Sequence, residues 1–359
     1  MKEFSGKNID RKELLSKVGS LSQLAHITPF QYTGGTADGV KGFQVSNGTG
    51  LDFTVLESKC LDIVNMKYKG MNLNFLPKSG IISPALSDCE GTEFLRCISG
   101  GMMYTCGLLN VGAACSADGL DQIFHGRMKT TPAEVVNTSC GWEGNDLKLR
   151  IGGEMREAGL FHDNLVLKRS IMTNAGDKHV VITDEIENQG FEEQGLMLLY
   201  HINIGYPVLD EGAEFVAPSM GIKTRKGDVS AEGMDAWNEI TEPVQGFTEQ
   251  VFVHKMAGDE SGETCAAVIN EKLELGVYVK YNKKMLPNLI EWKSMRAGDY
   301  AFGIEPSTSL CSGRAYEKEN GALKKIAPFE TLVFKLEIGV LEGPDEIKDF
   351  KDRVSGLKG

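Results

Sequence analysis

A histidine and an asparagine lie two residues apart within an apolar run at 195–207 (GLMLLYHINIGYP) of this 359-residue chain. If the run is a strand, His201 and Asn203 point to the same face, because alternate residues of a strand share a face. Burying a polar side chain in an apolar strand costs free energy unless the side chain forms a hydrogen bond. His201 is therefore either a hydrogen-bonded core histidine or an acid that titrates near neutral pH.

A carboxylate near the end of a second apolar run, 300–306 (YAFGIEP), is a candidate base. Glu305 shares its strand face with Ala301 and Gly303, whose small size leaves room for a ligand over the strand. Pro306 keeps the residue before it extended and ends the regular hydrogen-bond ladder. Glu305 is thus either a carboxylate in a ligand site or a surface carboxylate at a strand end.

A histidine and an arginine flank a glycine at 124–127 (FHGR). Both His125 and Arg127 can reach an oxygen-rich ligand, because the glycine lets that ligand approach the backbone. The alternative is an ordinary loop that carries a solvated arginine.

A tryptophan between two charged residues is the fourth candidate. Trp292 can stack on the apolar face of a sugar, although a half-buried tryptophan explains the same pattern. Its neighbour Lys293, together with Arg127, favours an acidic or phosphorylated sugar, because both side chains donate charge-assisted hydrogen bonds. Either cation can instead pair with a nearby carboxylate.

The elements that must position these side chains have a period of two residues. The even positions of 331–340 and the odd positions of 273–281 are apolar, and 180–187 and 147–151 alternate in the same way. Many of the 42 glycines fall in turn sequences between such runs. Because no helical segments alternate with these strands, the pattern indicates an all-β, antiparallel sandwich rather than a parallel α/β sheet.

Helical patterns are confined to the two ends of the chain. Asp10 can cap a helix, and an apolar stripe behind it predicts a helical extension over about 8–24. Pro344 opens a second helical pattern, which predicts a short helix over about 344–355. Linkers, charge blocks and internal repeats are lacking, so we expect a single domain over 1–359.

Composition argues against several classes of partner and chemistry. With 50 acidic and 38 basic side chains the net charge is −12, which repels nucleic acids and anionic lipid surfaces. The first residues lack a signal-peptide pattern and no run approaches about 18 apolar residues, so we expect a cytoplasmic protein. The eight cysteines form no C-x-x-C pair and are interpreted as reduced thiols. P-loop, dinucleotide-binding, zinc-protease and nucleophile-elbow motifs are absent.

The order of these motifs resembles the aldose 1-epimerase (galactose mutarotase) superfamily, and more narrowly an uncharacterised aldose 1-epimerase-like branch of it. The segments that carry the resemblance are 60–63 (CLDI), 69–73 (KGMNL), 100–107 (GGMMYTCG), 125–127 (HGR), 199–207 (LYHINIGYP) and 303–306 (GIEP). The likeness covers nearly the whole chain.

The resemblance implies a β-supersandwich with short terminal helices, a sugar cleft on one concave sheet, and no metal or organic cofactor. By the same resemblance, His201 corresponds to the acid that protonates the sugar ring oxygen, and Glu305 to the base that takes the anomeric hydroxyl proton. His125 corresponds to a substrate contact, with Arg127 as its neighbour. The expected cleft is completed by Asn203, Trp292 and Lys293. We expect a small-molecule sugar as the partner, and a monomer or homodimer.

The sequence departs from the classical mutarotase pattern, which has an aromatic residue between the strand histidine and its asparagine and a separate substrate-binding aspartate. Here Ile202 lies between His201 and Asn203, and no aspartate can be assigned to that role. Two functions are the main alternatives: a sugar 1-epimerase that interconverts α and β anomers by acid/base ring opening, and a non-catalytic carbohydrate-binding or sensing protein.

Other sugar chemistry, by a lyase or a glycoside hydrolase, is less favoured. Hydrolysis usually needs two facing carboxylates, and Glu305 is the one well-placed candidate, with Glu291 a poor second.

Overall fold

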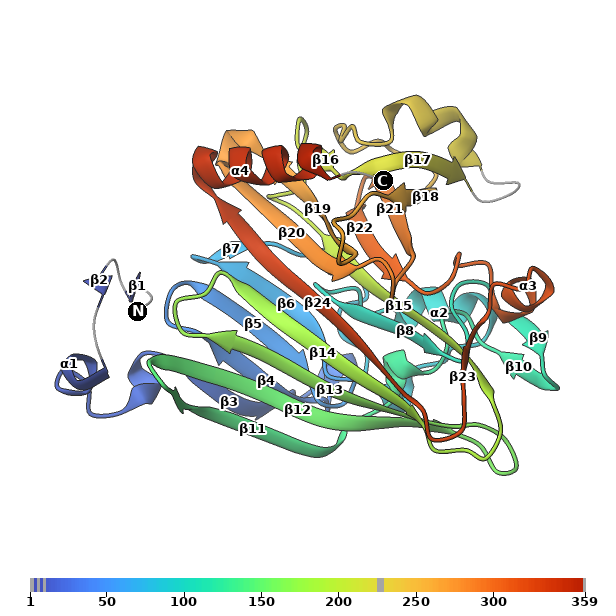
Figure 1. Ribbon diagram of the computed structural model, residues 1–359, viewed down its shortest axis with the longest axis horizontal. Helices are drawn as coiled ribbons and strands as arrows, with labels where there is room; N and C mark the ends of the chain where they lie inside the picture. Colours follow the sequence, from blue (N-terminus) through green and yellow to red (C-terminus); the bar gives the residue numbers. More distant parts are fainter. Residues whose placement is uncertain (1–2, 5–6, 9–10, 225–228, 358–359) are drawn as a thin grey trace.

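The protein is built almost entirely from antiparallel strands. The structure, a computed structural model, describes residues 3–4, 7–8, 11–224 and 229–357. Within those ranges the strands form three large sheets and two small hairpins, and the helices are short (Figure 1). The expectation of an all-β sandwich is confirmed.

The strand order places elements from both halves of the chain in the same sheets. The eight-stranded sheet runs in the order β11 (Glu134–Glu143), β12 (Asp146–Ala158), β13 (Asn164–Asn174), β14 (His179–Asn188), β24 (Thr331–Glu342), β20 (Leu275–Asn282), β19 (Glu263–Asn270), β16 (Glu214–Val216). The seven-stranded sheet runs β17 (Ser219–Thr224), β18 (Gln250–Met256), β21 (Asn288–Arg296), β22 (Asp299–Ser307), β15 (Gln194–Ile204), β23 (Lys324–Ile326), and β8 (Tyr104–Leu108) also pairs with β15. The five-stranded sheet runs β3 (His26–Gln31), β4 (Lys41–Ser46), β5 (Leu51–Leu56), β6 (Asp62–Tyr68), β7 (Met71–Asn72). The two hairpins are β1 (Glu3–Phe4) with β2 (Lys7–Asn8), and β9 (Cys115–Ala117) with β10 (Leu120–Gln122).

The helices lie at the ends of the chain and in loops. The α-helices are α1 (Arg11–Leu15), α2 (Phe94–Cys97), α3 (Arg314–Glu319) and α4 (Gly343–Gly356). The 3₁₀ segments are Leu21–Gln23, Gly35–Ala37, Pro84–Leu86, Gly91–Glu93, Met128–Thr130, Val229–Ala236 and Glu271–Leu273. None of the helices in the described ranges is long and apolar enough to cross a membrane.

The two terminal helices compare differently with the sequence prediction. Helix α4 spans nearly the predicted residues and buries Ile347, Phe350 and Val354. The predicted N-terminal helix is instead divided: α1 ends at Leu15, and Ser20 caps a separate 3₁₀ turn at Leu21–Gln23. The predicted cap Asp10 lies outside the described residues.

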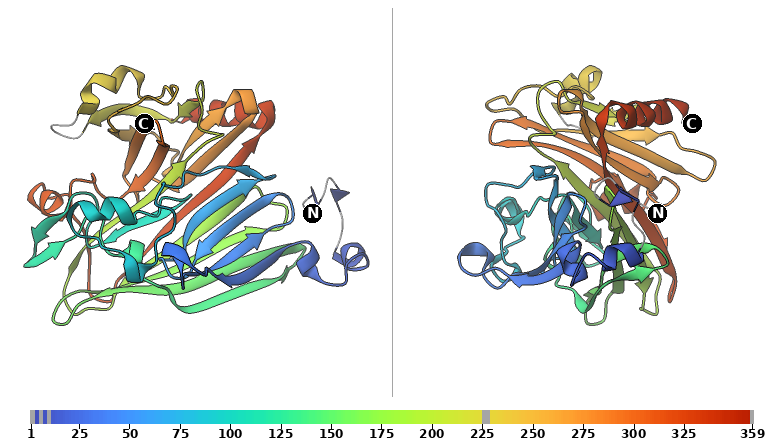
Figure 2. Two further views of the ribbon diagram at one scale, coloured as in Figure 1. Left: turned by 180° about the vertical axis from the view of Figure 1, so that it is seen from behind. Right: turned by 90° about the vertical axis from the view of Figure 1, so that its left-hand side faces the viewer.

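One large core joins the sheets. The inward side chains of β24, from Phe334 to Val340 at alternate positions, are buried as their period of two predicts. They belong to a continuous cluster that also contains inward residues of β5, β6, β12 to β15 and β20. Figure 2 (left) shows the blue five-stranded sheet lying over the green strands of the eight-stranded sheet. This packing fixes β15, whose other face carries the candidate site.

A buried charged network anchors β8 and β15 from behind. The guanidinium of Arg169 is fully buried and bonds Asp62 at 3.0 Å and Asp184 at 2.7 Å. The hydroxyl of Tyr200, on β15, donates to Asp184 at 2.8 Å, and the hydroxyl of Thr105, on β8, donates to Asp62 at 2.5 Å. Because residues next to Thr105 and Tyr200 point to the opposite face, the network also fixes the backbone that carries the site.

Candidate active site

His201 and Glu305 meet across the neighbouring strands β15 and β22. Pairing of Asn203 with Gly303 sets the register of the two strands. His201 Nε2 lies 3.0 Å from Glu305 Oε1, and the side chains are only 8% and 2% exposed. The structure therefore brings together the two residues that the sequence singled out as acid and base, and it holds them almost out of contact with water.

Gly303 makes this contact possible. A Cβ atom at this position would lie 2.6 Å from Glu305 Oε1, 3.0 Å from Trp292 Cβ and 3.4 Å from His201 Cε1. The sequence suggested that the bare glycine leaves room for a ligand. In the structure the Glu305 carboxylate itself leans over the glycine towards His201.

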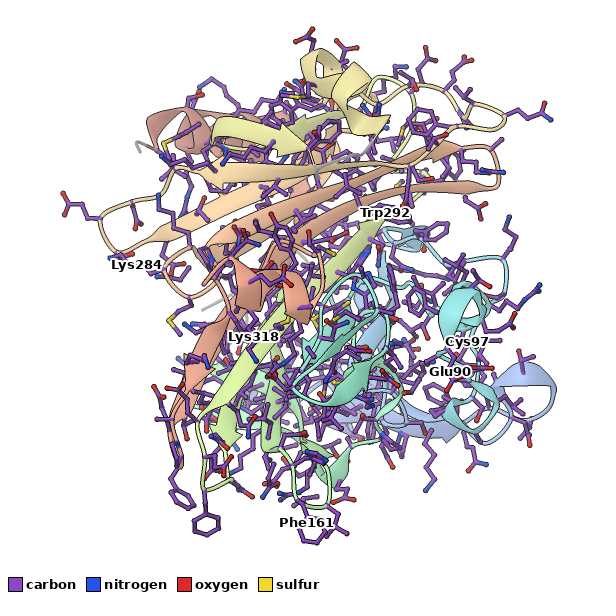
Figure 3. All side chains as sticks on the ribbon, turned by 90° about the vertical axis from the view of Figure 1, so that its right-hand side faces the viewer. Glu90, Cys97, Phe161, Lys284, Trp292 and Lys318 are labelled. Carbon is purple, nitrogen blue, oxygen red and sulfur yellow. The ribbon has the colours of Figure 1, made fainter. Side chains whose placement is uncertain are left out.

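Three rings surround the imidazole of His201. The ring centroids of Trp292, Tyr104 and His125 lie 5.3, 6.1 and 6.0 Å from that of His201, all at steep interplanar angles. Trp292 is itself held by a hydrogen bond of 2.7 Å from its Nε1 to Glu249 Oε2. Figure 3 shows Trp292 where the orange strands approach the cyan and blue segments of the chain. These contacts fix the plane of the imidazole.

His125 lies in a turn with positive φ angles, where a backbone N–H faces its ring. Its φ is +57° and that of Gly126 is +72°, a conformation that favours glycine at the second position. The backbone N–H of Gly112 donates to His125 Nδ1 at 3.2 Å. A neutral imidazole that accepts at Nδ1 carries its proton on Nε2, so His125 can donate a hydrogen bond from that atom.

Burial controls the charge of His201. Removal from water lowers its pKa to about 4, and a hydrogen bond to the Asn203 side chain offsets part of this effect. The Asn203 amide also donates to the carbonyl oxygens of Gly101 and of His201, at 2.9 and 3.0 Å. Asn203 therefore ties the strand to the loop before β8, with its amide N–H groups already used on the backbone.

Arg127 is held by partners outside this group of rings. Its guanidinium donates to the carbonyl oxygen of Asp121 at 2.9 Å and lies 3.6 Å from Glu157 Oε1. Glu157 comes from β12, thirty residues along the chain, and no local pattern reveals such a pair.

Lys293 is on the wrong face of its strand for the predicted cleft. Residues 292 and 293 are adjacent on β21 and point to opposite faces, and Lys293 Nζ donates to the carbonyl oxygen of Ala236 at 2.8 Å. Glu291 shares that far face, where it contacts His254 Nε2 at 2.9 Å. The prediction that Lys293 shares the cleft is therefore wrong. The structure brings together His125, His201, Asn203, Trp292 and Glu305.

Several neighbours of the site carried no recognisable signal in the sequence. Lys129 is buried, and its Nζ donates to the carbonyl oxygens of Phe124 and Gly126 on both sides of His125. Tyr104, by contrast, lies in the GGMMYTCG motif of the sequence, and in the structure it pairs directly with His201 across β8 and β15. No three His, Cys, Asp or Glu side chains of the described ranges are grouped so that they could hold a metal ion.

Comparison with known proteins places the fold. A family described as a domain of unknown function (DUF4432) matches residues 37–340, and no curated protein matches the chain. A Klebsiella pneumoniae protein provisionally assigned as an aldose 1-epimerase is 24% identical, covers 98% of this chain and 91% of its own, and superposes with a TM-score of 0.88. A galactose 1-epimerase from Lactobacillus acidophilus is 12% identical, with coverages of 89% and 99% and a TM-score of 0.60. A galactose mutarotase-like protein from Clostridium acetobutylicum is 14% identical, with the same coverages and a TM-score of 0.62. The fold is thus the galactose mutarotase-like sandwich.

Proposed function

The chain belongs to the DUF4432 family, and we propose that it is a sugar 1-epimerase, which interconverts the α and β anomers of an aldose or modified aldose. The observation that carries the proposal is the 3.0 Å approach of His201 Nε2 to Glu305 Oε1. A proton donor and a proton acceptor so placed are what ring opening of a hemiacetal needs. The names of the similar folds, a galactose 1-epimerase among them, agree with this chemistry.

Two proton transfers make up the reaction. The Glu305 carboxylate takes the proton from the anomeric hydroxyl, while His201 delivers a proton to the ring oxygen, so that the C1–O5 bond breaks and an aldehyde forms. Rotation about C1–C2 and reclosure by the reverse transfers give the other anomer. The reaction therefore starts with the proton on His201 Nε2 and with Glu305 ionised. Burial lowers the pKa of His201, and the Glu305 carboxylate, 3.0 Å away, favours the protonated imidazole against that effect. Each transfer contributes about 10²- to 10⁴-fold to the rate.

The rings around the pair supply binding and exclude water. We propose that His125 donates its Nε2 proton to a sugar hydroxyl and that Trp292 packs against the apolar face of the sugar. Excluding water from the site strengthens the electrostatic interaction between His201 and Glu305. The position of Glu291 beside His254, on the far face of β21, argues against a hydrolase that would use Glu291 and Glu305 as two facing carboxylates.

Saturation-transfer NMR on a panel of neutral aldoses tests the proposal. Magnetisation passed from one anomer to the other reports exchange at equilibrium, without a coupled assay. We expect at least one sugar whose exchange is accelerated in proportion to protein concentration. Binding of a sugar without accelerated exchange would instead support the non-catalytic carbohydrate-binding function.

A further inference from the structure

A cavity of about 470 Å³ lies at the end of β15 and the start of β22, and its lining is uncharged. No acidic, basic or histidine side chain contributes to it, although a quarter of the residues in the chain are charged. Its walls include aromatic and amide side chains, namely Tyr32, Phe75, Tyr206, Tyr300, Asn65 and Asn72, beside aliphatic ones such as Ile81.

Several polar groups of this cavity are available to a ligand. In the part of the chain that the structure describes, the Asn65 amide and the hydroxyls of Tyr32 and Tyr206 form no hydrogen bond. Tyr206 is 66% exposed, so much of this residue is accessible to a ligand. An amide offers both a donor and an acceptor, as vicinal hydroxyl groups require, and aromatic faces suit the C–H face of a pyranose. The absence of cations in the lining disfavours a phosphate or a nucleotide.

Phe75 connects this cavity to the His201–Glu305 pair. It lines the cavity, and its ring centroid lies 6.4 Å from that of Trp292, which in turn packs on His201. Its backbone N–H donates to the carbonyl oxygen of Asn203 at 3.0 Å. Gly205, at the cavity, is four residues beyond His201, or about 13 Å along an extended chain. One pyranose ring at the pair does not reach that far, whereas linked rings do.

We propose that this cavity binds a further sugar unit, so that the preferred substrate is a neutral reducing oligosaccharide with its reducing-end ring at His201 and Glu305. The proposal rests on the epimerase function for its catalytic part. The binding part concerns the cavity alone and can be tested without catalysis.

The catalytic test compares sugars that share the same reducing-end ring. Glucose, cellobiose, maltose and lactose all end in glucose, so their kcat/KM values for anomer exchange differ only through the second unit. We expect at least one disaccharide to exceed glucose by about tenfold, the scale of one hydrogen bond. Asn65→Ala and Tyr206→Ala should reduce that ratio towards one, while Tyr206→Phe keeps the ring and most of the ratio.

A matched control and a binding measurement separate the possible failures. Tyr316→Ala removes an exposed tyrosine from α3 and should leave the ratio as it is. Methyl β-cellobioside and methyl β-glucoside cannot mutarotate, so the difference between their affinities in NMR titrations reports the second ring without any catalysis. Tighter binding of the cellobioside, lost in Tyr206→Ala, supports the cavity even if no sugar exchanges anomers, in which case only the epimerase proposal fails. Equal kcat/KM for glucose and every disaccharide, with equal binding of the two glycosides, overturns the oligosaccharide site and leaves the epimerase in place.

Discussion

The buried ammonium of Lys129 holds His125 in its turn. Lys129 Nζ donates to the carbonyl oxygen before His125, that of Phe124, at 2.5 Å, and also to the one after it, that of Gly126. Lys129 is only 3% exposed, and burial lowers its pKa. A long flexible cation thereby fixes a backbone conformation with two consecutive positive φ values, from which His125 points to His201.

Lys129→Met tests this positioning. The methionine keeps the apolar stem but leaves two carbonyl oxygens without their donor, at a cost of about 1–3 kcal/mol for each buried group. If His125 binds substrate, KM for a responsive sugar should rise about tenfold with a smaller change in kcat. Lys318→Met, at a 59% exposed side chain, is the control. An unchanged KM together with unchanged stability would show that the turn does not need Lys129.

Gly303→Ala tests the geometry of the pair with one added carbon. The new methyl group would lie 2.6 Å from Glu305 Oε1, so the carboxylate must leave His201. We expect kcat for anomer exchange to fall by about 10²-fold, the lower end of the range for one general base. Gly221→Ala is a matched strand control, because nothing lies within 4 Å of a Cβ at that position. Retention of full activity by Gly303→Ala would contradict the proposed contact.

Arg169→Met tests the network behind the site. The substitution leaves the carboxylates of Asp62 and Asp184 buried without their cation, which typically costs about 3–5 kcal/mol. Urea unfolding should show that loss as a lower midpoint. Arg296→Met, at a 54% exposed side chain, should change stability by less than about 0.5 kcal/mol. Equal midpoints for the two variants would mean that the network contributes little to stability.

Glu157 predicts how stability depends on pH. Burial raises its pKa from 4.5 to about 7, against the hydrogen bonds from the backbone of Leu108 and Leu109. A raised pKa means that the folded state favours the neutral acid. The stabilisation that the raised pKa of Glu157 gives the folded state is therefore complete below pH 4.5, and it is lost as the pH rises through 7.

Glu157→Gln removes this titration while keeping an acceptor for the two backbone N–H groups. Relative to the parent protein, the variant should gain stability by about 3 kcal/mol between pH 5 and pH 8. Glu319→Gln, at an exposed residue of α3, is the matched control for the chemical change. A stability difference for Glu157→Gln that does not change with pH would place the pKa of this carboxyl near its ordinary value.

The sequence predicted those parts of the site that depend on strand parity. His201 and Asn203, or Gly303 and Glu305, share a face because of a spacing of two, and the structure has that arrangement. The same rule places Lys293 opposite Trp292. The prediction for Lys293 is wrong, because adjacent residues of a strand point to opposite faces and Lys293 Nζ bonds the carbonyl oxygen of Ala236 on the far face.

Contacts between distant segments could not be predicted in this way. Glu157, on β12, pairs with the guanidinium of Arg127 in a loop thirty residues earlier, and carbonyl oxygens of a turn surround the buried ammonium group of Lys129. Nothing in the spacing of these residues distinguishes them from solvated surface charges. Likewise, the N-terminal apolar stripe suggested one helix, whereas the cap at Ser20 starts a separate turn.

In the proposed reaction, Glu305 accepts the proton of the anomeric hydroxyl group. Glu305→Gln keeps the size of the side chain and a hydrogen-bonding group near His201 but removes the carboxylate. Saturation-transfer NMR on a responsive sugar should show exchange reduced by about 10²-fold or more, with binding of the sugar preserved. Anomer exchange as fast as in the parent protein would mean that Glu305 is not the base.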